Sequence, residues 1–148
     1  MRAAAVALLA LALVAGCSGG SGRLSNEEYA QQADALCTKY DAELAKLPSP
    51  TTLDALAQMA VQAKAIAAEG AAKLRALQPP EELQKQADAW LALNDANVKD
   101  IESMRVAAAA NDRVKVQEIA RDASRNEAKA DELARKLGLK ACASSTGR

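Results

Sequence analysis

Apolar side chains recur at intervals of three and four residues from Tyr29 to Leu137, and short polar or proline-containing segments divide them into four stretches. This spacing places side chains on one face of an α-helix, so each stretch predicts one amphipathic helix. Strand-forming residues are scarce, which favours an all-helical body. The apolar positions are Tyr29, Ala33, Leu36, Tyr40, Leu44 and Leu47; Leu53, Leu56, Ala60, Ala63, Ala67, Leu74 and Leu77; Leu83, Ala87, Trp90, Ile101, Met104 and Ala108; and Val116, Ile119, Ala123, Ala130, Leu133 and Leu137.

Helix start signals precede all four stretches. Residues 25–28 (SNEE) form a capping box, in which the serine hydroxyl and the last glutamate each accept a backbone N–H. Thr51 is expected to cap the second helix, and Pro80 is expected to occupy the first position of the third. Asn111 and Asp112 interrupt the apolar pattern, so they are expected to end the third helix and cap the fourth.

Helix stop signals keep the connections short. Residues 48–50 (PSP) end the first helix, residues 79–80 (PP) end the second, and Gly138 suits the left-handed backbone just past the fourth. Helices joined by short connections pack antiparallel. The predicted fold class is therefore all-α, an antiparallel up-down-up-down four-helix bundle over residues 25–142. One longer helix in place of two is the main alternative, and the proline pairs argue against it.

The predicted helices differ in charge, which suggests how they are arranged. The first and third helices are acidic, the second is close to neutral and the fourth is basic. We expect the first and third to flank the fourth, although an exposed ion pair contributes only ~0–1 kcal/mol. Gly70 lies inside the second helix, where glycine costs ~1 kcal/mol relative to alanine. It indicates either the close approach of a neighbouring helix or a functional kink.

Residues 1–16 have the features of a secretory signal. Arg2 precedes an apolar run over residues 3–14, and small residues come just before Cys17. The run is about 12 residues long, shorter than the ~20 that a membrane-spanning helix needs. Residues 14–17 (VAGC) resemble the bacterial lipobox, which implies cleavage before Cys17 and linkage of this cysteine to diacylglycerol. The alternative is an ordinary secreted protein in which Cys17 merely adjoins the cleavage point.

The lipobox resemblance implies a division of the chain into four parts. Residues 1–16 are the signal peptide, residues 17–24 are the lipidated cysteine and a flexible Ser/Gly tether, residues 25–142 are the bundle, and residues 143–148 are a disordered tail. It also implies a location, the extracytoplasmic face of a bacterial cell membrane. The membrane is therefore one predicted partner, reached through the lipid anchor.

The chain has three cysteines, an awkward number for an exported protein because one is left unpaired. If Cys17 carries lipid, Cys37 and Cys142 remain, and outside the cytoplasm they can form a disulfide. Cys37 lies some 18 Å along the first helix, and the tail after Gly138 can reach roughly 15 Å, so the bridge is tight but feasible. The alternative is a pair of buried free thiols.

Composition argues against several classes of function. The 19 basic and 19 acidic residues balance, so no electrostatic footprint for nucleic acid is present. The chain has no histidine, the commonest general base and metal ligand. Lys99 and Ser103 lie one helical turn apart and form a nominal nucleophilic pair, but such pairs are frequent on exposed helices. We expect no enzymatic activity, no catalytic residues, no metal and no cofactor.

The third predicted helix carries weak candidates for ligand binding. Asn94 and Asn97 follow Trp90, the single tryptophan, and interrupt the apolar stripe. The asparagines could line a polar pocket, set the helix register as a buried amide, or face water at the flank of the helix. Trp90 itself fits the largest packing group of the core better than a binding platform.

Four short motifs are distributed over the predicted helical body. They are YAQQADALC at residues 29–37, LQPP at residues 77–80 followed by Leu83, AWL at residues 89–91, and GLKAC at residues 138–142. Together they resemble a group of small actinobacterial lipoproteins and secreted proteins. The paired Cys37 and Cys142 are the most specific elements. The resemblance implies a helical secreted body with these two cysteines bridged, and it implies no particular activity.

These observations predict a membrane-anchored, non-catalytic helical module that binds a protein partner of the cell envelope or acts as a scaffold there. The alternative is a carrier of a lipid or small hydrophobe that uses a cleft between the helices. Alanine-rich helices can approach closely and leave little room for a ligand, which favours the first prediction, but splayed helices can still open a cleft. An apolar cleft beside Trp90 would favour the carrier, whereas a closed bundle with an exposed apolar patch above ~400 Å² would favour a protein partner.

Overall fold

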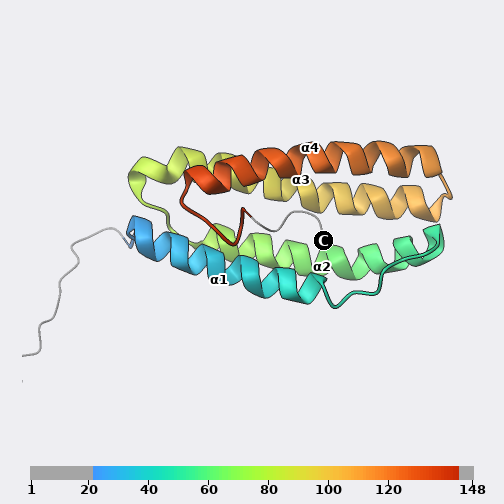
Figure 1. Ribbon diagram of the computed structural model, residues 1–148, viewed down its shortest axis with the longest axis horizontal. Coiled ribbons are helices and arrows are strands. Elements are labelled where there is room, and N and C mark those ends of the chain that lie inside the picture. Colours follow the sequence, from blue (N-terminus) through green and yellow to red (C-terminus); the bar gives the residue numbers. More distant parts are fainter. Residues whose placement is uncertain (1–21, 144–148) are drawn as a thin grey trace, which may run out of the picture.

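The computed structural model describes residues 22–143, whose fold is an antiparallel bundle of four α-helices (Figure 1). The helices are α1 (Asn26–Leu44), α2 (Leu53–Ala76), α3 (Gln84–Ala109) and α4 (Arg113–Lys136), and a 3-10 turn, η1 (Glu81–Leu83), precedes α3. Each helix packs on the next, α1 on α2, α2 on α3 and α3 on α4. The predicted all-α four-helix bundle is confirmed. The predicted signal peptide, Cys17 and residues 144–148 lie outside the described residues.

The first two helices begin at side-chain caps. The capping box of α1 is confirmed, because the Ser25 hydroxyl accepts the Glu28 N–H at 3.3 Å and the Ser25 N–H donates to the Glu28 carboxylate at 2.9 Å. The expectation that Thr51 caps α2 is wrong. Thr52 directly precedes the helix in an extended conformation, so its hydroxyl accepts the Ala55 N–H at 3.1 Å.

The last two helices begin differently from each other. Pro80 precedes η1 rather than opening an α-helix, because the Leu83 N–H donates to the Pro80 carbonyl at 3.0 Å in a three-residue turn. Asp112 caps α4 as expected, and its carboxylate accepts the Lys115 N–H at 2.9 Å. Gly138 follows α4 with a φ of 77°, which confirms the predicted left-handed end.

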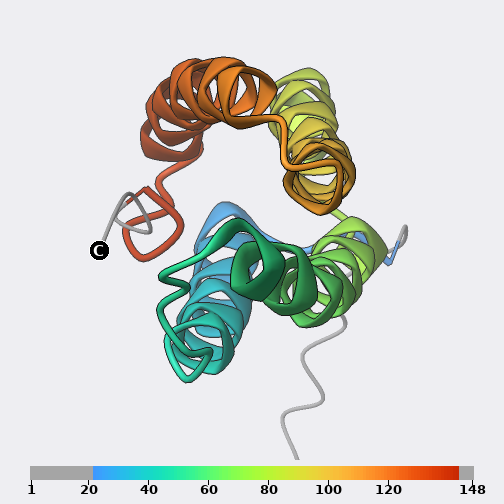
Figure 2. The ribbon, with the colours of Figure 1, turned by 90° about the vertical axis from the view of Figure 1, so that its right-hand side faces the viewer.

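The bundle is open on one side. Within residues 22–143, α1 and α4 share no extensive contact, and residues 138–143 fold back into the space between them (Figures 1 and 2). The expected charge arrangement is therefore only half right, since α3 flanks α4 but the returning tail separates α1 from it.

Ion pairs join α2 to α3, from Lys64 to Glu102 at 3.2 Å and from Arg75 to Asp95.

The hydrophobic core is concentrated at the end of the bundle where α1 begins. Its most buried large side chains are Tyr29 of α1, Trp90 of α3 and Leu139 of the tail, each at most 2 % exposed. Burial, followed by the charge of Asp88, raises the pKa of Tyr29 to about 12. Trp90 is thus the largest packing group of the core, as the sequence predicted.

Gly70 permits the close packing of α1 on α2. A Cβ atom at this position would lie 3.1 Å from two carbon atoms of the Tyr40 ring, closer than an ordinary van der Waals contact. The helix continues through Gly70 to Ala76. Close approach of a neighbouring helix, one of the two predictions for this glycine, is therefore confirmed.

The residues just before α1 are attached to the bundle. The Arg23 guanidinium donates to the Pro79 carbonyl at 2.7 Å, and the Leu24 N–H donates to the Gln78 carbonyl at 2.9 Å. The end of the segment predicted as a tether is therefore fixed against the turn between α2 and α3. None of the helices in residues 22–143 is both long and apolar enough to cross a membrane.

Candidate functional site

An apolar cleft of about 460 Å³ lies inside the bundle, between all four helices. Its walls consist mainly of leucine, alanine and methionine side chains, and Trp90 and Cys142 line it as well. The apolar residues that line it are Leu36, Leu44, Leu56, Met59, Ala60, Ala63, Ala67, Ala71, Leu74, Val98, Ile101, Met104 and Ala123.

Small side chains of α2 face the cleft, on a bundle that is open between α1 and α4. Ala60, Ala63, Ala67 and Ala71 of α2 are single methyl groups that do not fill the space opposite α4. The tail segment 138–143 lies between α1 and α4, and within residues 22–143 these two helices share no extensive contact. The expectation that alanine-rich helices leave little room is therefore wrong for this bundle.

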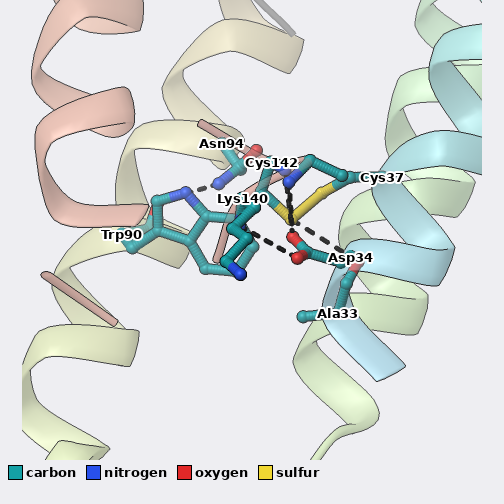
Figure 3. The surroundings of a disulfide bond; sticks show 8 residues. Ala33, Asp34, Cys37, Trp90, Asn94, Lys140 and Cys142 are labelled. Atoms are coloured by element: carbon teal, nitrogen blue, oxygen red, sulfur yellow. Dashed lines mark hydrogen bonds between the residues drawn. A yellow bond between two sulfur atoms is a disulfide. The ribbon is translucent and has the colours of Figure 1, made fainter. Parts of the chain in front are cut away.

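A disulfide fixes the tail at the edge of the cleft. Cys37 and Cys142 are bonded with their Cα atoms 5.2 Å apart, which confirms the predicted pair. Figure 3 shows the Trp90 ring directed from α3 toward the tail segment that carries Cys142, with Cys37 of α1 on the other side. Both cysteines and Trp90 line the cleft, so the disulfide forms part of its wall.

Asp34 supplies a second attachment for the tail, and sequence reasoning missed it. Its carboxylate accepts the backbone N–H groups of Lys140 and Ala141 at 2.9 Å and of Cys142 at 3.2 Å (Figure 3). Asp34 lies one helical turn before Cys37 and therefore on the same face of the helix. This spacing was the available signal that Asp34 could reach the segment joined to Cys37. The tail is therefore held to α1 by a covalent bond and three charge-assisted hydrogen bonds.

The two asparagines singled out in the sequence both line the cleft beside Trp90. The Asn94 amide donates to the Trp90 carbonyl at 3.0 Å. The Asn97 side-chain oxygen is buried and has no hydrogen-bond partner within residues 22–143. An unpaired buried acceptor costs about 1–3 kcal/mol, so a donor entering the cleft would recover that loss.

Three carboxylates also line the cleft, and the sequence analysis did not identify them as site residues. They are Asp41 of α1, Asp100 of α3 and Glu127 of α4. Burial raises the pKa of Glu127, and the nearby charges of Asp131 and Asp41 raise it further. Position 127 falls between Ala123 and Ala130 in the apolar stripe of α4, and a charged residue at such a position was the available signal.

The remaining candidates lie elsewhere. Lys99 and Ser103, the nominal nucleophilic pair, are both exposed on α3 and neither lines the cleft. Among residues 22–143, cysteine and carboxylate side chains form no group of three that could hold a metal ion. The structure therefore brings Trp90, Asn94 and Asn97 to one site and leaves the Lys99–Ser103 pair outside it.

Comparison of the chain with models of protein families, with curated proteins and with solved structures found no match.

Proposed function

We propose that this chain is an extracytoplasmic, lipid-anchored binding protein that holds a small hydrophobic molecule in the cleft beside Trp90. The single observation that carries the proposal is an apolar cleft of about 460 Å³ bounded by all four helices. Sites for small molecules usually measure about 300–1,000 Å³ and combine apolar walls with a few polar groups. Asn94 and Asn97 supply polar groups of that kind.

The cleft favours a carrier over the protein-binding scaffold that the sequence alone favoured. A bundle that served only as a scaffold would gain stability by filling its interior, because buried voids cost packing energy. Here the apolar face of α2 lines an open cleft, and the Cys37–Cys142 disulfide forms part of the wall of that cleft. A hydrophobic ligand would cover this surface and add contacts that the protein alone does not make.

Proximity to a bilayer fits the same function. If Cys17 carries lipid, residues 18–22 are the only spacer before Arg23, whose side chain contacts the turn between α2 and α3. Five residues of Gly/Ser-rich chain span roughly 12 Å on the random-coil relation. The cleft would therefore be held close to a membrane from which hydrophobic molecules could be taken up.

Titration with decanol tests the binding function. Trp90 is the only tryptophan of the chain and lines the cleft, so its fluorescence reports on the site directly. We expect a saturable change in emission with one decanol bound per chain, measured below the solubility limit of the alcohol. An emission that does not change, or that changes without saturation, would contradict the proposal.

Substitution of the predicted lipidation site tests the anchor independently. The Cys17→Ala chain is expected to lose diacylglycerol, because the modification needs the cysteine thiol. It should therefore no longer be retained in the detergent-rich phase when a detergent extract is separated into two phases. The Cys37→Ala and Cys142→Ala double variant is the matched control and should stay membrane-bound. Unchanged retention of the Cys17→Ala chain would remove the lipoprotein proposal and leave the cleft argument intact.

A further inference from the structure

We infer that the ligand of the cleft is a cationic amphiphile, with an apolar body and a protonated amine that lies against the carboxylates of the wall. The inference rests on the proposed binding function and adds the charge of the ligand. It is carried by the charged side chains that line the cleft, which among residues 22–143 are all carboxylates.

The charged residues of the wall all have one sign. Asp41, Asp100 and Glu127 line the cleft, and none of its lining residues within 22–143 is lysine or arginine. The three carboxylates come from α1, α3 and α4, so they reach the cleft from three different helices. A ligand anion would meet like charges there, whereas a cation would meet opposite charges.

Glu127 is the carboxylate most in need of a partner. It is only partly exposed, and it makes no hydrogen bond or ion pair within residues 22–143. The neighbouring charges of Asp41 and Asp131 repel it. By contrast, exposed acidic residues of the same helix are paired, as Glu132 is with Lys136 at 2.7 Å. A bound ammonium group would supply the missing counter-charge.

One neutral group of the cleft also offers an unpaired acceptor to a donor on the ligand. The Asn97 oxygen is a buried acceptor with no partner. The Tyr40 hydroxyl already donates to Glu69 at 2.8 Å, and the Asn94 amide donates to the Trp90 carbonyl. An ammonium group carries N–H donors, so it can donate to the unpaired Asn97 oxygen.

Three unbranched ten-carbon probes test the inference: decylamine, decanol and decanoate. At neutral pH the amine is protonated and the carboxylate is ionised, so the probes differ in charge at one end only. The protein is the exported, oxidised chain from Ser18, which includes all the contacts that build the bundle, and Trp90 emission is the readout. We expect decylamine to bind at least about tenfold more tightly than decanol, and decanoate to bind most weakly.

Two substitutions locate the source of this preference. Glu127→Gln keeps the shape of the side chain and removes its charge, and Asp41→Asn does the same on another helix. Each is expected to reduce the preference for decylamine over decanol several-fold, while Glu132→Gln, an exposed control on the same helix, leaves it unchanged. Glu127→Gln should also raise the thermal midpoint of the ligand-free protein, because it removes a repelled, partly buried charge.

The outcomes separate this inference from the function on which it rests. Equal binding of the three probes, or tighter binding of decanoate, would overturn the cationic ligand while leaving the hydrophobic binding function standing. A preference for decylamine that survives both Glu127→Gln and Asp41→Asn would overturn the assigned carboxylates. Failure of all three probes to bind would overturn the binding function itself, and the inference with it.

Discussion

Removal of the Cys37–Cys142 disulfide is expected to lower the free energy of unfolding by about 2–5 kcal/mol, the largest stability change that we expect from any single feature. The bond closes a loop with a sequence separation of 105 residues, so it restricts the unfolded chain strongly. It also fixes Cys142, which is buried at 4 % exposure beside Trp90. Urea denaturation of the Cys37→Ala and Cys142→Ala double variant, followed by circular dichroism, measures the effect.

Reduction of the native disulfide provides a matched comparison. The reduced protein should unfold near the midpoint of the double variant, whereas reductant should leave the midpoint of that variant unchanged. The tail lies between α1 and α4, which share no extensive contact. Without the disulfide, the tail should therefore lose its fixed position between them. The Trp90 emission maximum should then shift to longer wavelength. An oxidised and a reduced protein with the same midpoint would show that the Asp34 hydrogen bonds alone hold the tail.

Filling the cleft is expected to weaken decanol binding by about a hundredfold or more while the bundle still folds. Ala67 lines the cleft on α2, and Ala67→Phe would place an aromatic ring in the space that the ligand occupies. A loss of this size corresponds to about 2.7 kcal/mol or more of binding free energy. Titration of Trp90 emission gives the affinity, and thermal unfolding checks that the variant is folded.

The next residue in the chain offers the control. Ala68 is exposed, so Ala68→Phe adds the same ring outside the cleft. Its affinity for decanol should equal that of the unaltered chain. Equal affinities for the Ala67→Phe and Ala68→Phe proteins would mean that decanol binds somewhere other than this cleft.

The helices could be predicted from sequence because their signals are local. The apolar spacing, the capping box at Ser25 and the left-handed glycine at Gly138 each act within a few residues of the chain. Errors arose where two adjacent residues could serve equally well. Thr51 and Thr52 have the same side chain, and only the geometry of the turn selects Thr52 as the cap.

The cleft could not be predicted, because periodicity identifies which residues face inward but not whether they meet. The alanines of α2 would fit a tightly packed bundle as well as an open one. The position of the tail decides between the two, and that position depends on the long-range contacts of Asp34 with residues 140–142. Trp90, Asn94 and Asn97 were found as candidates because they interrupt or dominate an apolar stripe.

The carboxylates of the cleft show what a closer sequence reading could add. Glu127 occupies an inward position in the stripe of α4, four residues after Ala123 and three before Ala130. A charged residue at such a position is costly unless it has a partner, so it indicates either a buried ion pair or a ligand. The structure places Glu127 at the wall of the cleft without a hydrogen-bonded or ion-paired partner in residues 22–143.

Native mass spectrometry of the exported, oxidised chain, purified gently from cells, would show whether the cleft holds a ligand. We expect a reproducible bound mass on the unaltered protein that is absent from the Ala67→Phe protein prepared in the same way. The mass would also identify the chemistry of the ligand, and a nitrogen-containing amphiphile is expected. A ligand-free mass for both proteins, in preparations that retain the disulfide, would overturn the proposed binding function and favour the role of a scaffold or protein-binding module.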